Sequence, residues 1–242
     1  TLGSLATDSI SIADNAEFLI NTDQDIVFDT PISGSGEFRK SGTGMLTLPG
    51  IDYTGGTSVD QGTLEIGSDT STDAVIAGPV TVADQATLIF NKDGSDATYS
   101  DVISGAGSFE KHGNSNLIMT GNNVYQGATV ISEGRLTLGS GAASAGLATQ
   151  SIINNSEFVI DSDNDIVINA LVSGTGSVQK SGTGKATLAG VSNYTGGTSV
   201  NQGTLEIGSD TSTDAVIPGN VSVSDQAKLI FNKDGNNLTY SD

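Results

Sequence analysis

The stretch TSVDQGTLEIGSDTSTDAVI at residues 57–76 recurs as TSVNQGTLEIGSDTSTDAVI at residues 198–217, and the single difference is Asp60 against Asn201. The two copies lie 141 residues apart, and near-identity over 20 positions indicates a duplication. A chain that repeats itself at a fixed period is typical of a solenoid or another repeat architecture. The repeat is therefore the main evidence for the fold.

A weaker repeat of half that length lies inside the duplicated unit. ISGSGEFRKSGTG begins at Ile32, ISGAGSFEKHGNS at Ile103 and VSGTGSVQKSGTG at Val172, in steps of 71 and 69 residues. No Pro-rich or Gly/Ser-rich boundary separates the copies, so we predict one continuous domain over residues 1–242. Its units are expected at about 10–79, 80–150 and 151–220, with a partial unit at 221–242. Because the chain starts and stops within the pattern, we interpret it as an excised segment.

Apolar and polar residues alternate with a period of two within each unit, which is typical of half-buried β-strands. In the first unit the alternating apolar residues are Phe38, Met45, Leu46, Leu48, Val59, Leu64 and Ile66. No segment has the apolar spacing of an amphipathic helix over more than one turn. The glycine-containing residues 139–150 are predicted to form a loop.

Short strands separated by Gly, Asn and Asp turns at a constant period predict an all-β fold, a parallel β-helix. Each unit would supply about three coils if a coil takes roughly 20–25 residues. With about 4.8 Å between strands, the chain would form a rod about 50 Å long. A sandwich of short antiparallel strands is the alternative, but it does not account for a repeat that continues without a break.

The composition suits a thin, repeated core and restricts the partners. The 242 residues include 32 glycines and 5% aromatic residues, with no tryptophan and no cysteine, which excludes disulfides and thiolate metal sites. A net charge of −19 with nine Lys and Arg excludes a nucleic-acid binder that relies on phosphate neutralisation. No apolar run is long enough to span a bilayer, so we predict no direct membrane insertion by this segment.

Three lysines and the single histidine are candidates for chemistry. Lys40, Lys111 and Lys180 recur at one phase of the repeat, and we expect their stems to pack on a coil face with the ammonium groups reaching solvent. His112 stands where the other units have Ser41 and Ser181, so it is interpreted as a turn substitution. With one histidine, His-based triads and His-cluster metal sites are excluded by count.

The acidic turns resemble calcium loops only in part. Asp161, Asp163 and Asp165 have the spacing that opens an EF-hand, but its sixth position is Ile166 and its twelfth is Val172, where the motif needs Gly and Glu. The counterparts are Asn21, Asp23 and Asp25 in the first unit and Asn91, Asp93 and Asp96 in the second, so the carboxylates do not keep one phase. We predict solvated turns and no metal site, with weak incidental binding of calcium as the alternative.

An enzyme active site should depart from the repeat, because catalytic groups are needed once. The acidic residues recur instead, as Glu65 and Glu206, Asp69 and Asp210, and Asp73 and Asp214. Residues 182–186 lack the spacing of a phosphate-binding loop. We therefore predict no catalytic and no cofactor-binding residue, and a protein that is not an enzyme.

Residues 40–68, KSGTGMLTLPGIDYTGGTSVDQGTLEIGS, resemble the passenger-associated β-strand repeat of autotransporters, the type V secreted surface proteins of Gram-negative bacteria. Residues 180–209 match equally well. Residues 111–140 are a degraded copy, with YQGAT at Tyr125 in place of YTGGT. The resemblance implies a right-handed, single-stranded parallel β-helix displayed at the cell surface, outside the outer membrane.

Passengers with this repeat mostly serve adhesion, which sets the functional expectation. We predict a rod-like scaffold that supports self-association of copies, aggregation or biofilm formation. The alternative is a receptor- or glycan-binding module of a host-directed adhesin. A β-helical polysaccharide-degrading enzyme is a third and weaker hypothesis.

Overall fold

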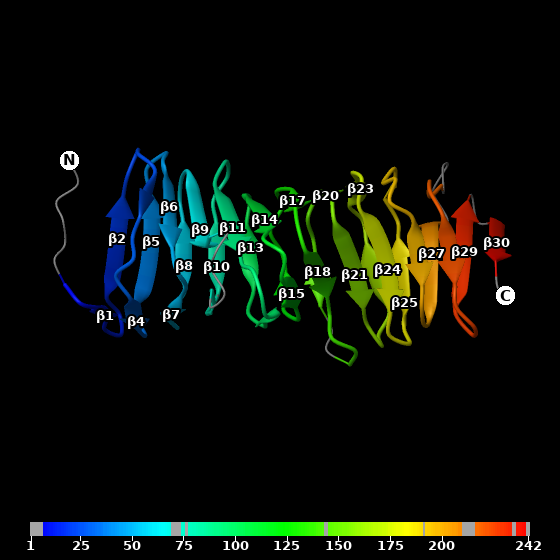
Figure 1. The fold of residues 1–242 in the computed structure, drawn as a ribbon, viewed down its shortest axis with the longest axis horizontal. Coiled ribbons are helices and arrows are strands. Elements are labelled where there is room, and N and C mark those ends of the chain that lie inside the picture. Colours follow the sequence, from blue (N-terminus) through cyan, green and yellow to red (C-terminus); the bar gives the residue numbers. More distant parts are fainter. Residues whose placement is uncertain are drawn as a thin grey trace.

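The computed structural model describes residues 7–68, 74–75, 77–142, 145–190, 192–209, 216–233 and 236–240. The described residues form strands and no helix. Figure 1 shows the strands stacked side by side along one axis, from the N-terminal end at the left to the C-terminal end at the right. The predicted all-β parallel β-helix is confirmed. In the described part of the chain there is no helix with the length and hydropathy needed for a membrane span.

The strands follow the order of the repeat. Those of the first unit are β1 (Ile10–Ile12), β2 (Glu17–Asn21), β3 (Ile26–Val27), β4 (Ile32–Gly34), β5 (Glu37–Ser41), β6 (Met45–Leu48), β7 (Asp52–Tyr53), β8 (Thr57–Val59) and β9 (Thr63–Gly67). Those of the second are β10 (Val80–Val82), β11 (Thr87–Asn91), β12 (Ala97–Tyr99), β13 (Ile103–Gly105), β14 (Ser108–His112), β15 (Asn116–Met119), β16 (Asn122–Asn123), β17 (Thr129–Ile131), β18 (Arg135–Leu138) and β19 (Gly146–Leu147). The remaining strands are β20 (Ser151–Asn154), β21 (Glu157–Asp161), β22 (Ile166–Ile168), β23 (Leu171–Ser173), β24 (Ser177–Ser181), β25 (Lys185–Leu188), β26 (Thr198–Val200), β27 (Thr204–Ser209), β28 (Val221–Val223), β29 (Lys228–Lys233) and β30 (Asn236–Tyr240).

Each coil crosses three faces of the rod, numbered here in the order in which the chain meets them. Face 1 begins with β1-β4-β7, face 2 with β2-β5-β8-β10-β13, and face 3 with β3-β6-β9-β11-β14-β17-β20-β23. Paired residues on neighbouring coils are between 18 positions apart, as for Met45 and Thr63, and 24 apart, as for Thr63 and Thr87. Coil length therefore varies while the register of the strands is kept.

Successive units do not begin on the same face. β8 pairs with β10 and β9 with β11, so the second unit opens on face 2 instead of face 1. The chain between β9 and β10 crosses face 1, where the backbone nitrogen of Ile51 donates to the carbonyl of Val75 at 2.7 Å. At the end of the second unit β19 makes the same extra crossing, beside β16. Each unit thus supplies three coils and one further crossing, more than the three coils expected, and each unit is turned by one face relative to the last.

The remaining sheets continue faces 1 and 2. β12-β15-β18-β21-β24-β26-β28 extends face 1, and β16-β19 followed by β22-β25-β27-β29 extends face 2. The last pair departs from the parallel pattern, because β30 lies antiparallel to β29. Its counterpart in the second unit, β12, pairs in parallel with β15 on the following coil.

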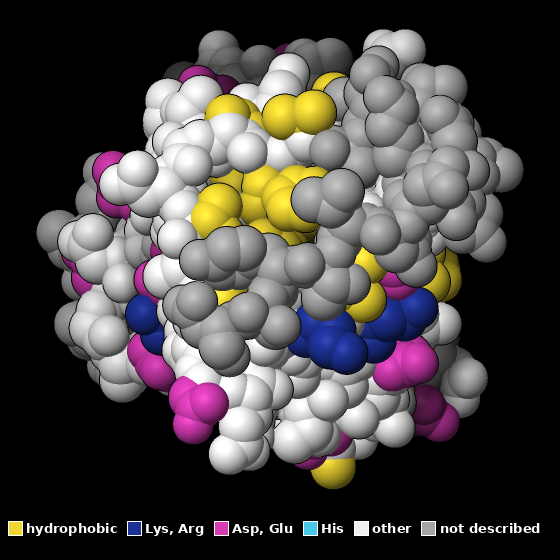
Figure 2. Space-filling view, turned by 90° about the vertical axis from the view of Figure 1, so that its right-hand side faces the viewer, with side chains coloured by type: hydrophobic (Ala, Val, Ile, Leu, Met, Phe, Trp, Pro, Cys, Tyr) yellow, Lys and Arg dark blue, Asp and Glu magenta, His cyan; other side chains and the backbone are white. Residues whose placement is uncertain are grey.

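The core consists of inward side chains stacked in columns. On face 3, Leu46, Leu64, Leu88 and Phe109 follow one another in register, and all have 0% exposure. Figure 2, a view along the rod from its C-terminal end, shows hydrophobic side chains in the middle and charged ones toward the rim. The predicted alternation holds except at Met45, which is half-buried on the outer side because Leu46 takes the inward position.

Candidate functional site

The three recurring lysines lie in the core, which corrects the expectation that their ammonium groups reach solvent. Lys40, Lys111 and Lys180 each have 0% exposure. Lys40 shares the inward parity of Phe38, and in register it lies between the apolar residues Ile20 and Val59. The side chain therefore occupies a core column, and its charge must be satisfied inside the rod.

Backbone carbonyls satisfy each buried ammonium. Lys40 Nζ donates to the carbonyls of Ser41 at 2.9 Å and Gly42 at 2.7 Å, in its own turn, and to that of Gln61 in the next coil at 3.2 Å. Carbonyl dipoles pointed at one cation replace the water lost on burial.

The same arrangement recurs in the other two units. Lys111 and Lys180 donate at 2.7 Å to the carbonyls of Gly113 and Gly182. Lys111 also donates to the carbonyl of His112, and Lys180 to that of Ser181. Burial lowers the pKa of Lys111 to about 8. Each lysine ties a glycine turn to the core, which is a structural role that explains its recurrence.

The acidic turns connect one coil to the next. Asp23 Oδ1 accepts the backbone N–H of Thr43 at 2.9 Å, and Asp25 Oδ1 accepts that of Met45 at 2.8 Å. Thr43 lies one coil further on, in the turn that contains Gly42 and Gly44, and Met45 is the first residue of β6 directly after that turn. The hydrogen bond from the Thr43 backbone lowers the pKa of Asp23.

Equivalent contacts join the coils of the other units. The acceptor–donor pairs are Asp93–Asn114 at 2.7 Å, Asp96–Asn116 at 3.3 Å, Asp163–Thr183 at 2.8 Å and Asp165–Lys185 at 3.0 Å. We expected these carboxylates not to occupy equivalent positions in the three units, and this expectation is wrong. In the folded chain they make the same contacts in each unit. The second unit has one extra residue in the turn, where Gly94 adopts a φ of 79°, and this turn absorbs the shift in sequence.

The recurring glutamates are also held by the scaffold. Glu65 accepts hydrogen bonds from Thr47 at 2.9 Å and Asn91 at 3.0 Å. Burial favours a raised pKa for Glu206, but bonds from Lys185 at 2.8 Å and Asn232 at 2.8 Å lower the pKa overall. Asp69, Asp73, Asp210 and Asp214 lie outside the described residues.

The described part of the chain gathers no metal-binding cluster of acidic side chains, and three of its surface hollows lack the carboxylate pair that hydrolysis needs. No group of three or more His, Asp or Glu side chains there could hold a metal ion. Three surface hollows, with volumes of about 310, 500 and 490 Å³, each have one carboxylate in their lining, from Asp52, Asp225 and Glu206. Glycoside hydrolysis needs a facing pair of carboxylates, which none of these three hollows provides.

His112 forms a hydrogen bond with Glu110 on the same strand. Its Nε2 lies 3.0 Å from Glu110 Oε2, and this hydrogen bond, together with the nearby charges of Glu65 and Glu133, raises the pKa of the imidazole. The side chain is partly exposed at the turn where Ser41 and Ser181 stand in the other units.

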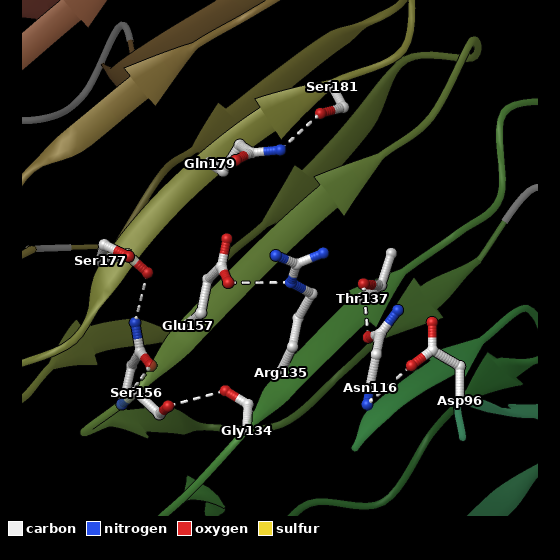
Figure 3. Close-up of polar contacts among 11 residues, drawn as sticks. Asp96, Asn116, Gly134, Arg135, Thr137, Ser156, Glu157, Ser177, Gln179 and Ser181 are labelled. Atoms are coloured by element: carbon white, nitrogen blue, oxygen red, sulfur yellow. Dashed lines mark hydrogen bonds and ion pairs between the residues drawn. The ribbon is translucent and has the colours of Figure 1, made fainter. Parts of the chain in front are cut away.

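The outward side chains pair with one another across coils. Figure 3 shows this on face 1, where Arg135 on β18 points to Glu157 on β21 with an Nε–Oε2 distance of 2.8 Å. On the strand before, Asn116 accepts a hydrogen bond from Thr137 at 2.8 Å. We call these rows of paired outward side chains ladders. Each pair adds a modest amount to the stability of the strand register.

Four of the five tyrosines lie in the core and not at the surface. Tyr53, Tyr99, Tyr125 and Tyr194 are at most 1% exposed. Three of them make the same hydrogen bond to a threonine four residues on, at 2.8, 2.6 and 2.7 Å for Tyr53, Tyr125 and Tyr194. A stacking platform for sugars would need exposed rings, which these four residues do not supply.

Comparison with known proteins agrees with this architecture. The family described as passenger-associated transport repeat matches residues 38–66, 109–138 and 178–207. These matches run from β5 to β9, from β14 to β18 and from β24 to β27, so each of the three full-length units contains one. The protein is a repeat-built parallel solenoid of the passenger class.

The chain belongs to the passenger domains of autotransporters. It is 33% identical over 202 residues to the adhesin BmaC autotransporter of Brucella suis biovar 1 (strain 1330). The match covers 83% of this chain and 4% of that relative's length. No solved structure matches the chain.

Proposed function

We propose that the chain is part of the rod-like shaft of a surface adhesin and that it supports self-association of copies on neighbouring cells. The supporting observation is that the groups capable of chemistry are engaged by the scaffold. The ammonium of Lys40 is bound by carbonyls, and the carboxylates of Asp23 and Asp25 are bound by the next coil. Each added unit therefore lengthens the rod and enlarges its surface.

The proposal includes display at the surface of a Gram-negative bacterium and a role that is not enzymatic. Membership of the autotransporter passengers supports the location, and the name adhesin of the Brucella relative supports the role. Repetition makes weak contacts multivalent, so a long rod can hold cells together through contacts that are individually weak. Aggregation and biofilm formation are the expected consequences.

A cell-mixing experiment tests the proposal. The chain is displayed on a non-aggregating bacterium labelled in one colour and mixed with cells of a second colour that carry the display system alone. We expect the mixture to settle faster than control cells, in clumps of the displaying colour only.

The same experiment separates the alternative functions. Clumps of both colours, or attachment to immobilised glycans without clumping, would support the receptor- or glycan-binding alternative. Settling at the control rate would contradict self-association through this segment.

A further inference from the structure

The first strand of each coil is short, and its outer surface carries few charges. On face 1 the outward residues Ser11, Ser33 and Asp52 are in register on β1, β4 and β7, followed by exposed Val75. We call this row strip 1. Apart from Asp52 it carries no charge.

The second and third units have their own strips. Strip 2, on face 2, consists of Thr81, Ser104, Val124 and Ala148. Strip 3, on face 3, consists of Ile153, Ser173 and Asn193, with Leu171 beside them. These seven strip positions and Leu171 are all uncharged, and Val124, Ile153 and Leu171 are 41%, 38% and 39% exposed.

The charged ladders lie on the second and third strands of each coil. Examples are Arg39 between Glu17 and Asp60, Arg135 with Glu157, and Lys185 with Glu206. The chain has a net charge of −19, so two copies repel each other. The repulsion is weakest where surfaces without carboxylates face each other. Strips 2 and 3 are such regions, and strip 1 is one apart from Asp52. The exposed Val, Ile and Leu side chains of the strips gain from being covered.

We infer that the strips are the surfaces on which a second copy of this chain docks side by side, an inference that rests on the proposed self-association. Because each unit is turned by one face, strips 1, 2 and 3 face three different directions. One rod therefore binds neighbours on three sides and builds a network of rods in place of closed pairs.

The size of a strip makes each contact weak. Four coils at about 4.8 Å give a length of about 20 Å, and with a width of about 10 Å the covered area is roughly 200 Å² on each rod. A stable interface needs about 800 Å² per partner, so one strip gives a transient contact and several are needed together. Acidic residues at the edges of strip 2, Asp84 and Asp101, oppose approach at low salt.

Charge substitution on the strips tests the inference. Val124→Glu and Ile153→Glu each add one carboxylate to a strip, and Leu19→Glu and Val27→Glu add one to an exposed apolar residue elsewhere. Circular dichroism and the melting midpoint first verify that all four are folded. In sedimentation velocity we expect the wild-type chain to associate with rising concentration, and more strongly in 0.5 M than in 0.02 M salt, because salt screens repulsion.

The two strip variants should raise the concentration at half-association several-fold, and the two control variants should leave it unchanged. Equal association of strip variants and wild type, or equal loss in the controls, would overturn the assignment of the strips while leaving self-association intact. A wild-type chain that stays monomeric throughout would overturn the proposed function and the strips with it.

Cysteine crosslinking tests the three directions, since the chain has no native cysteine. Under oxidation, Ser104→Cys alone and Ser173→Cys alone should give dimers, and the double variant should give a ladder of higher oligomers. Val27→Cys should stay largely monomeric. A double variant that stops at dimers would contradict docking on more than one side, and crosslinking of Val27→Cys equal to that of Ser104→Cys would contradict docking at the strips.

Discussion

Asp25 Oδ1 lies 2.8 Å from the backbone nitrogen of Met45, a residue one coil further along the rod. The two residues are 20 positions apart in sequence, and the contact recurs as Asp96 with Asn116 and Asp165 with Lys185. A carboxylate that accepts a backbone N–H in this way both satisfies the donor and fixes the distance between coils. The rod is therefore joined at its turns as well as along its strands.

Removing one such contact should lower stability by a modest amount. We expect Asp25→Ala to reduce the free energy of unfolding by about 1 kcal/mol, because the Met45 N–H loses its acceptor. Urea unfolding followed by circular dichroism measures the change. Asp52→Ala, which removes an exposed carboxylate from a strand, is the matched control, and an equal loss in both variants would contradict a specific role for Asp25.

The acidic turns also predict the direction of acid sensitivity. Backbone hydrogen bonds lower the pKa values of Asp23 and Asp163 below the ordinary 3.8. The folded chain thus holds these carboxylates ionised at pH values where the unfolded chain binds protons, so their stabilisation is present above about pH 4 and is lost as the pH falls further. Melting midpoints between pH 2 and 6 should fall most steeply below pH 4, and the Asp23→Asn/Asp163→Asn double variant should have a flatter profile. Parallel profiles for the two proteins would exclude this linkage.

The buried lysines predict a larger effect from loss of one ammonium. Lys180→Met keeps the stem but leaves the carbonyls of Ser181 and Gly182 without their donor, so we expect a loss of about 1–3 kcal/mol in the free energy of unfolding. Lys185→Met removes a lysine whose side chain is 44% exposed and should change stability by less than about 1 kcal/mol. Unchanged stability in Lys180→Met would mean that the carbonyls find other partners.

The glycine turns predict where side chains cannot be added. A Cβ at Gly42, which has a φ of 78°, would lie 2.4 Å from the carbonyl oxygen of Thr22 on the neighbouring coil. We expect Gly42→Ala to cost roughly 2–4 kcal/mol, through both backbone strain and the clash. At Gly50 the nearest atom would be 3.2 Å away, so Gly50→Ala should be tolerated with a smaller loss in the same urea titration.

The sequence was sufficient for the class of fold, because alternation and a constant period need no knowledge of distant contacts. The alternation in the sequence also indicated that the lysines are buried. Lys40 is two residues from Phe38 and shares its inward parity, but the general tendency of lysine to reach solvent favoured the other interpretation. The alternation was the better guide, since carbonyls of the adjacent turn were available to bind the charge.

Other features depended on relations that counting along the chain could not recover. Asp25 and Asp96 occupy equivalent places although an extra residue precedes the second, and only the conformation of Gly94 reveals this. Val75 marks the additional crossing of face 1 in the first unit, and the sequence around it is rich in Ser, Thr and Asp, a composition typical of a loop. Because coils vary from 18 to 24 residues, the length of a unit did not fix its number of coils.

Because of the extra crossing, the number of units determines the direction in which any segment beyond them faces. Gain or loss of one unit swings the distal part of the rod by a third of a revolution, and the 141-residue duplication, which comprises two units, swings it by two thirds. Three units restore the original direction. Changes in repeat number during evolution would thus alter both the length of the rod and the orientation of its distal end about the rod axis.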